Sequence, residues 1–180
     1  MNHSLIAIML CAGLLCPKYS LAAGNAAPNG PVTGKAAAKP TPQFAINIPA
    51  FKDGEAVPVQ FTCDGANRPP EILISGTPKG ARTLALLLHD TDAPAGDWTH
   101  WLVYNLPPST TKLALPLPGN AEQGVNDYGK TEYYGPCPPP RTHNYYFEVY
   151  ALSSALKFKH PPHRADLLYA IEGKTLAKAQ

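Results

Sequence analysis

The chain has 180 residues, enough for one domain with additional segments. Hydrophobic residues make up 44% of it and charged residues only 16%, and its formal charge of +2 comes without a run of Lys or Arg, which argues against a nucleic-acid-binding protein. The 21 prolines and 14 glycines favour short strands, turns and loops over a helical bundle.

Residues 1–22 have the pattern of a signal peptide. Leu5–Leu15 is an apolar run too short to cross a bilayer as a helix, and Ser20-Leu21-Ala22 fits the small-x-small pattern of a cleavage site. Met1–Ser4 has no Lys or Arg, so an uncleaved N-terminal anchor is the alternative. We expect cleavage near Ala22, a periplasmic or secreted protein, and no transmembrane span in the mature chain.

A linker and a folded domain are expected to follow. Residues 23–42 are rich in Ala, Pro, Gly, Lys and Thr without any period, which predicts a disordered linker, and the domain covers residues 43–180. Cys11 and Cys16 would leave with the signal peptide. Cys63 and Cys137 then remain, as one disulfide or as two buried thiols.

The domain reads as a series of short β-rich segments between Pro/Gly turns. The expected strands are Phe44–Ile48, Val57–Thr62, Thr83–His89, His100–Leu106 and Tyr145–Leu152. The continuous apolar run of Thr83–His89 predicts a central strand buried on both faces. Only the tail, from about His163 to Gln180, has helical spacing, and Gly173 is expected to separate two short helices. This pattern favours a mainly β fold, a Greek-key sandwich, over βαβ units.

Polar residues follow the buried strand directly, in His89-Asp90-Thr91-Asp92. In an extended chain, Asp90 and Asp92 point to the same side, and polar groups at the end of a buried strand commonly face a pocket at the sheet rim. An Asx-turn that caps the strand is the alternative for these two residues.

Two histidines lie at the expected starts of other strands. His100 lies between Trp98 and Trp101, where a packed, hydrogen-bonded role is the usual one. His143 follows the proline-rich loop Gly135–Arg141, which is stiff enough to hold it in place but could equally be a rigid connector. Each signal is weak alone.

Together these motifs are similar to those of one family. Asp-x-Asp-Ala-Pro at 90–94, His-Trp-Leu-Val at 100–103 before Asn-x-Pro, Gly-Pro-x-Pro-Pro at 135–139, His-x-Tyr at 143–145 and Phe-x-Val-Tyr-Ala-Leu at 147–152 occur in order. Thr62–Asn67 with Pro69-Pro70, and Gly124–Lys130, also fit. From about Phe44 to Ala177 the chain resembles the phosphatidylethanolamine-binding protein family, most closely its bacterial, Raf kinase inhibitor-like branch.

The resemblance implies a β-sandwich of two antiparallel sheets with a small pocket for phosphate, acetate-like anions or a phospholipid headgroup, and no cofactor or bound metal. The pocket residues that it implies are Asp90, Asp92, His100, His143 and Tyr145, with backbone donors from the loop around Gly135, Pro136 and Cys137 to Pro138. Pro94 lies where the family has a cis proline. An anion near two aspartates requires that the carboxylates be engaged elsewhere or the histidines protonated, which predicts tighter anion binding at mildly acidic pH.

This sequence departs from the family pattern at three places. Thr91 stands where the family usually has Pro, and Asn144 stands where it often has Arg, which removes a positive charge near the pocket. A Gly-x-Tyr strand that commonly follows the last helix in the family has no counterpart before Gln180, so we expect either that the terminus is cut short or that this strand is missing.

Three functions compete. The first is non-catalytic binding of small anions or phospholipid headgroups, such as phosphate or phosphoethanolamine. The second is a protein-interaction role, as an inhibitor of a protease or kinase, through the pocket rim. Tyr128, Tyr133 and Tyr134 could rim a lipid or a protein surface, or could simply pack within the β-sandwich. The third is a metal-dependent hydrolase that uses Asp90, Asp92, His100 and His143. No Gly-x-Ser-x-Gly or His-Glu-x-x-His motif is present, and we expect a binding protein rather than an enzyme.

Overall fold

A computed structural model describes residues 43–137 and 142–180. The predicted signal peptide and linker, and Pro138 in the proline-rich loop, lie outside these described residues. Eight strands are present among them, in two antiparallel sheets. The small sheet has the order β1 (Ala45–Asn47), β2 (Ile72–Ser75) and β5 (Lys112–Leu113). The large sheet has the order β6 (Glu122–Gln123), β4 (Trp98–Leu106), β3 (Thr83–Asp90), β7 (Tyr145–Leu152) and β8 (Thr175–Ala179).

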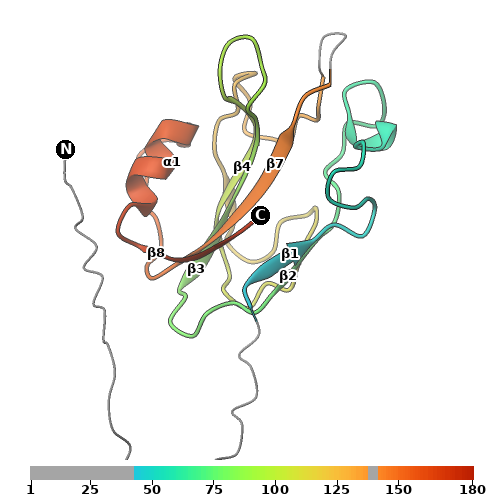
Figure 1. The fold of residues 1–180 in the computed structure, drawn as a ribbon. Helices are drawn as coiled ribbons and strands as arrows, with labels where there is room; N and C mark the ends of the chain where they lie inside the picture. The colour runs from blue at the N-terminus through green and yellow to red at the C-terminus, as the bar shows by residue number, and fades with distance from the viewer. Residues whose placement is uncertain (1–42, 138–141) are drawn as a thin grey trace, which may run out of the picture. The chain divides into compact units, whose positions relative to one another are not determined.

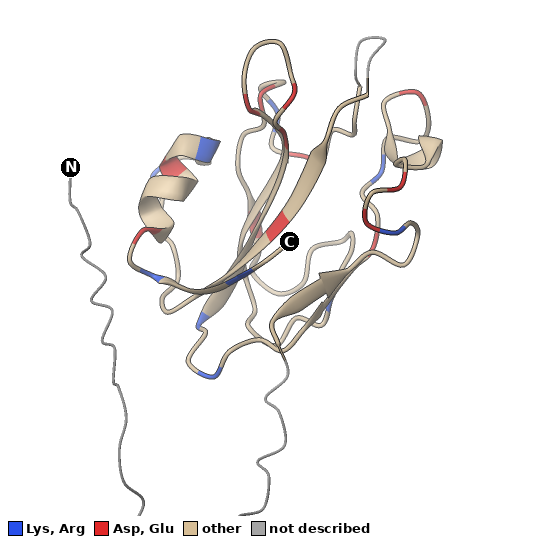
Figure 2. Cartoon of the chain, in the orientation of Figure 1, with Lys and Arg blue, Asp and Glu red and all other residues tan. Residues whose placement is uncertain are grey.

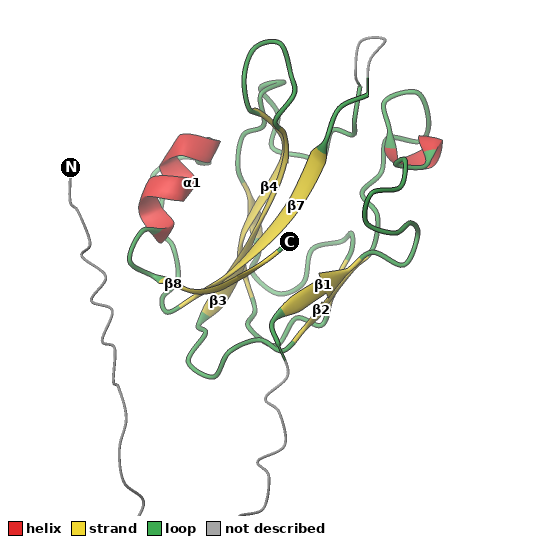
Figure 3. Ribbon diagram, in the orientation of Figure 1, coloured by secondary structure: helices red, strands yellow, loops and turns green. Residues whose placement is uncertain are grey.

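The large sheet lies between the small sheet on one side and helix α1 (Arg164–Ile171) on the other (Figure 1). Strands make up most of the regular structure, and helix is confined to α1 and the single turn η1 (Val59–Phe61) (Figure 3). The predicted class, mainly β with two antiparallel sheets, is therefore confirmed.

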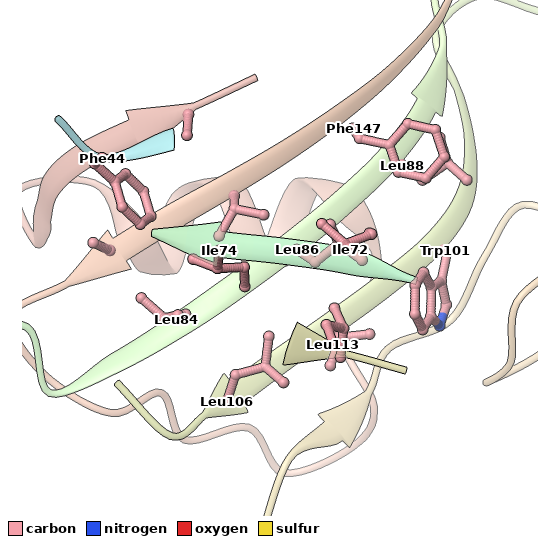
Figure 4. Packing of buried hydrophobic residues seen from close by; sticks show 14 of the residues in the cluster. Phe44, Ile72, Ile74, Leu84, Leu86, Leu88, Trp101, Leu106, Leu113 and Phe147 are labelled. Carbon is pink, nitrogen blue, oxygen red and sulfur yellow. The ribbon is translucent and has the colours of Figure 1, made fainter. Parts of the chain in front are cut away.

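Strand β3 is the centre of the molecule. All eight of its residues are buried, and it pairs with β4 on one side and β7 on the other. Side chains alternate across a strand, so Leu84, Leu86 and Leu88 face the small sheet whereas Ala85 and Leu87 face α1. Figure 4 shows the three leucines on the small-sheet side, Leu84, Leu86 and Leu88. They pack with Ile72 and Ile74 of β2 and with Phe147 of β7.

The helix covers the opposite face of the large sheet. Leu167 and Ile171 of α1 are buried against a cluster that includes Leu87, Leu102 and Tyr104. A strand that is buried on both faces gains stability from apolar residues at every position, which explains the continuous apolar run of β3. Residues 83–90 therefore form the predicted central strand, and the predicted strands 100–106 and 145–152 lie on either side of it within β4 and β7.

Two predicted segments were wrong. Val57–Thr62 is not a strand: Pro58 stands before the 3-10 turn η1, and Thr62 N–H donates to Val59 O at 3.0 Å. The tail has one helix rather than two. Gly173 has a φ of 69°, which ends α1 in the left-handed region that suits glycine. Residues 175–179, which were predicted as part of the second helix, instead pair with β7 as the edge strand β8.

The two covalent predictions had opposite outcomes. Cys63 and Cys137 form a disulfide, with Cα atoms 5.4 Å apart. The peptide bond before Pro94 is not cis; the cis bond among the described residues is Leu115–Pro116. Gly96 N–H donates to Ala93 O at 2.9 Å, so Pro94 occupies the second position of a turn that suits a trans proline. No helix in residues 43–137 or 142–180 is long and apolar enough to cross a membrane.

Candidate functional site

Three neighbouring strands of the large sheet bring the polar residues together at one edge. β3 ends at Asp90, and antiparallel pairing places Asp90 opposite Trp98 at the start of β4 and opposite Tyr145 at the start of β7. Directly opposed residues in adjacent strands point to the same face. A pocket of about 230 Å³ lies here, and it is lined by Asp90, Ala93, Pro94, Ala95, Trp98, His100, Tyr128, Cys137, His143 and Tyr145.

An irregularity in β4 accounts for the place of His100. Leu88 pairs with Trp101, but the next residue of β3, His89, pairs with Thr99, so β4 has one extra residue at His100. Such a β-bulge redirects a side chain. With plain alternation His100 would lie on the face opposite to Trp101. Both the bulged His100 and Trp98 instead line the pocket beside Asp90.

Asp90 is almost completely engaged by protein groups. His143 Nδ1 lies 2.6 Å from Asp90 Oδ2, and Asp92 N–H donates to Asp90 Oδ1 at 2.9 Å. Only 5% of the Asp90 side chain and 4% of the His143 side chain are exposed. A buried carboxylate needs such partners, and they leave it little capacity to repel an anion in the pocket.

His100 presents a neutral ring. Its Nδ1 lies 2.7 Å from the Tyr134 carbonyl oxygen, which can only accept, so Nδ1 carries the proton. Burial lowers the pKa of His100 below its usual value, because desolvation disfavours the imidazolium more than Tyr134 and the nearby Asp90 favour it. His100 therefore gains a positive charge at lower pH than a free histidine does.

Asp92 lies outside the pocket lining. Its Oδ2 accepts from both Asn144 N–H and Asn144 Nδ2, each at 2.8 Å. These two bonds from Asn144 lower the pKa of Asp92. Asp92 therefore holds the segment that carries His143. The alternative predicted from the sequence, an Asx-turn, is also present, because Asp92 N–H donates to the side-chain Oδ1 of Asp90 two residues earlier.

Two donors in the pocket wall are poorly satisfied by the described residues. Trp98 Nε1 and Tyr145 Oη are buried and make no hydrogen bond of ordinary geometry there, although Tyr128 lies near Trp98 and Asp90 lies near Tyr145. Desolvation, reinforced by the neighbouring Asp90 carboxylate, raises the pKa of Tyr145, so its hydroxyl stays protonated as a donor. A buried unsatisfied donor has a free-energy cost that a ligand acceptor would remove.

Residues 135–137 are held in place by several contacts. The Cys63–Cys137 disulfide ties them to the segment after η1, and Cys63 N–H donates to Pro136 O at 3.0 Å. Gly135 N–H already donates to Asn67 Oδ1 at 2.8 Å, and a proline has no N–H. Of the three predicted loop residues only Cys137 lines the pocket, whereas Pro136 lines a wider neighbouring groove of about 1100 Å³.

The predicted tyrosine rim is divided. Tyr128 lines the pocket, its ring stacks on Tyr134 with centroids 4.0 Å apart, and Lys130 Nζ lies 5.7 Å from the Tyr134 centroid. Tyr133 is instead buried against Trp101 and donates to Phe61 O at 2.5 Å.

Residue-by-residue reasoning missed Trp98 as a pocket residue. The β-bulge at His100, which places the side chains of both Trp98 and His100 in the pocket wall, is not visible in the sequence. Within residues 43–137 and 142–180, no group of three or more His, Cys, Asp or Glu side chains is arranged to hold a metal ion. The structure thus offers no support for the metal-dependent hydrolase alternative.

The two antiparallel sheets, and the polar pocket where β3 ends and β4 and β7 begin, define a β-sandwich with a rim pocket. Comparison with known families gives the same class, since residues 47–180 match the family described as phosphatidylethanolamine-binding protein. A UPF0098 protein of Methanothermobacter thermautotrophicus is 42% identical over 137 residues, covering 73% of this chain and 91% of that protein. One from Aquifex aeolicus is 39% identical over 138 residues, covering 72% and 81%.

Solved structures agree. The homolog CT736 of Chlamydia trachomatis superposes with a TM-score of 0.71 at 35% identity, covering 76% of this chain and 92% of that one. YbcL of E. coli, described as a member of the mammalian PEBP family, gives a TM-score of 0.71 at 31% identity, covering 76% and 93%. The chain belongs to the phosphatidylethanolamine-binding protein family.

Proposed function

We propose that this protein binds a small anion, or the phosphate-bearing headgroup of a phospholipid, in the pocket at the end of β3, without catalysing a reaction. One observation carries the proposal: the pocket wall holds two buried donors that make no hydrogen bond of ordinary geometry within the described residues, Trp98 Nε1 and Tyr145 Oη. A phosphate oxygen is the kind of acceptor that both would take.

The charges around the pocket are compatible with an anion. Asp90 is paired with His143 and Asp92 with Asn144, so neither carboxylate needs a cation from a ligand. Protonation of His100 would add a positive charge directly in the wall. Nucleophilic catalysis by a cysteine has less support, because Cys137, the cysteine of the pocket lining, is in a disulfide and supplies no thiolate.

Calorimetric titration with inorganic phosphate and with O-phosphoethanolamine tests the proposal, with ethanolamine as the probe that lacks phosphate. Tyr145→Phe removes one donor with little change of volume, and Trp98→Phe removes the other while it keeps an aromatic ring of smaller volume. We expect each to weaken phosphate binding about tenfold, as for a lost hydrogen bond to a charged group. Tyr169→Phe, at a residue 81% exposed on α1, is the matched control and should bind as the wild type does.

Two results would contradict the proposal. The first is a wild-type protein that binds neither phosphate compound. The second is normal phosphate binding by both Trp98→Phe and Tyr145→Phe.

The pocket rim favours a second candidate function, an inhibitor or modulator of a protease or kinase. Stacked Tyr128 and Tyr134 with Lys130 beside them form an aromatic, partly exposed surface next to the pocket. Aromatic residues are enriched in the energetically dominant parts of protein interfaces. Tyr134→Ala should then weaken inhibition in an assay against a panel of proteases and kinases, and phosphate binding should be unchanged. Absence of inhibition across the panel would remove this candidate.

We also propose that the protein is exported, with residues 1–22 removed. The Cys63–Cys137 disulfide supports an oxidising compartment. Intact-mass measurement of protein from the periplasm or medium should give the mass of a chain that begins after Ala22. A reduced, full-length chain found inside the cell would contradict export.

A further inference from the structure

The face of β3 opposite the pocket carries a second cluster of ionisable residues. His89 precedes Asp90 and so points to the face that α1 covers, where it is 6% exposed. Its cross-strand neighbour on β7 is Tyr146, with ring centroids 5.8 Å apart. The acidic segment within β7 in Figure 2 is Glu148, also buried. None of these residues lines the pocket.

Asp97 is the centre of this cluster. His89 Nδ1 lies 2.5 Å from Asp97 Oδ1, and Arg164, the first residue of α1, forms an ion pair with Asp97 Oδ2. His89 Nε2 lies 3.6 Å from Glu148 Oε1. Glu148 in turn pairs with Lys178 of β8 and accepts from Tyr150. The cluster thus connects β3, β7, β8 and α1 to a single loop aspartate.

That aspartate belongs to the loop that forms one wall of the pocket. Ala93, Pro94 and Ala95 line the pocket, and Asp97 stands two residues after Ala95 and directly before Trp98. The start of the loop is fixed on the pocket side, through Asp92 and Asn144. Its end has its side-chain anchor on the far face of the sheet, through Asp97.

We propose that His89 and Arg164 are positioning residues, which hold the wall 93–98 of the pocket in its binding geometry by anchoring Asp97 from behind the sheet. Neither residue touches the pocket, so their effect on a ligand is indirect. The ligand part of this inference rests on the proposed anion binding, whereas the order of the loop can be measured without ligand.

The charges around His89 give the anchor a pH dependence. Desolvation disfavours the imidazolium, but Glu148 and Asp97 outweigh it and raise the pKa of His89 above its usual value. The other charged groups here are Arg164 and Lys178. Tyr146 and Tyr150 also face the cluster, and burial together with the hydrogen bond to Glu148 raises the pKa of Tyr150, which stays neutral near pH 7. Because the pKa is raised in the folded state, the imidazolium stabilises the loop anchor below the usual pKa, and this contribution is lost as pH rises through the raised value.

The test uses Arg164→Gln and Asp97→Asn, with Arg164→Lys as the conservative variant. Lys159→Gln, at an exposed lysine that precedes α1, is the matched loss of one positive charge. Hydrogen exchange of the backbone amides of residues 95–98 in ligand-free protein reports the order of the wall. NMR titration of His89 reports its protonation, and calorimetry with inorganic phosphate reports binding.

We expect exchange protection of these amides and phosphate affinity each to fall about two- to fivefold in Arg164→Gln, in line with a partly exposed ion pair. Arg164→Lys should recover part of both, and Lys159→Gln should change neither. In Asp97→Asn the pKa of His89 should fall, and the pH at which wall protection is lost should fall with it.

Unchanged protection of residues 95–98 in both Arg164→Gln and Asp97→Asn would overturn the proposal. A pKa of His89 that is the same in Asp97→Asn as in the wild type would also overturn it. If the wild type fails to bind phosphate, the proposed function fails, and the exchange and titration results still decide whether His89 and Arg164 position the wall.

Discussion

His143 and Asp90 form a buried pair: Nδ1 of the histidine lies 2.6 Å from Oδ2 of the aspartate, across a sequence separation of 53 residues. The pair ties the end of central strand β3 to the segment that enters β7. It also gives a hydrogen-bond partner to the carboxylate that would otherwise face the pocket unpaired. One contact therefore serves both the geometry of the site and its ability to accept an anion.

His143→Ala should lower the free energy of unfolding by about 3 kcal/mol, because it leaves the buried Asp90 carboxylate without its charged or hydrogen-bonded partner. It should also abolish measurable phosphate binding. Urea unfolding and calorimetry check the two effects. His160→Ala, at an exposed histidine, is the control and should change neither. A His143→Ala protein as stable as the wild type would show that the pair is not a structural anchor.

Anion binding should become tighter as pH falls from 8 to 5, because protonated histidines in the pocket favour an anion, as we predicted from the sequence. The lowered pKa of His100 places its contribution at the acidic end of this range. Sulfate is the suitable probe for calorimetry, since its own charge does not change there. His100→Gln keeps a donor for the Tyr134 carbonyl and should flatten the acidic part of the profile. A flat wild-type profile would contradict this account.

The same group makes stability pH-dependent. Because burial depresses the pKa of His100, its neutral ring stabilises the fold above about pH 6.5. As pH falls below that value, the unfolded chain takes up the proton first and this stabilisation declines. The decline in urea midpoint between pH 6.5 and 5 should be smaller for His100→Gln than for the wild type.

Removing the Cys63–Cys137 disulfide should lower the free energy of unfolding by about 4 kcal/mol, the loop-entropy value for a sequence separation of 74 residues. Urea unfolding of the Cys63→Ser/Cys137→Ser double variant measures this loss. Reductant should destabilise the wild type and leave the double variant unchanged. A wild-type protein indifferent to reductant under unfolding conditions would contradict the prediction.

Gly135→Ala should destabilise the fold by about 1–3 kcal/mol and weaken phosphate binding, because a Cβ there would lie 2.1 Å from Phe61 O. Backbone would have to shift in the loop that carries Cys137. Gly173→Ala is the control. Its φ of 69° strains an alanine, but the added Cβ meets nothing within 4 Å and Gly173 does not line the pocket, so phosphate binding should not change. Equal phosphate affinity of Gly135→Ala and wild type would separate the loop from the pocket.

The sequence predicted the parts of the fold that local pattern determines. Thr83–Asp90 is apolar without interruption because both faces of β3 are covered, and that is visible in the residues themselves. β8 was mistaken for helix because its strand character comes from pairing with β7, a partner distant in sequence. Val59–Phe61 alternates as a strand would, but no neighbouring strand pairs with it.

The site shows the same division. Asp90, His100, His143 and Tyr145 were all named from sequence, and all line one pocket. Asp92 was assigned to the lining from alternation, which could not reveal that Asn144 holds it by two bonds. The network of His89, Asp97 and Arg164 was not found, since its members come from β3, a loop and α1 and carry no motif.

Asn144 offers a final test of the pocket's charge. Its side chain is exposed and its amide donates to Asp92, at a position where the resemblance to the family led us to expect Arg. Asn144→Arg would keep the backbone bond to Asp92 Oδ2 and add a positive charge next to His143. We expect phosphate to bind about two- to fivefold more tightly, the scale of a partly screened charge interaction. Salt should reduce this gain, so titrations at low and high ionic strength measure it directly. Asn144→Gln is the uncharged control, and a gain of affinity in Asn144→Gln equal to that in Asn144→Arg would show that charge is not the cause.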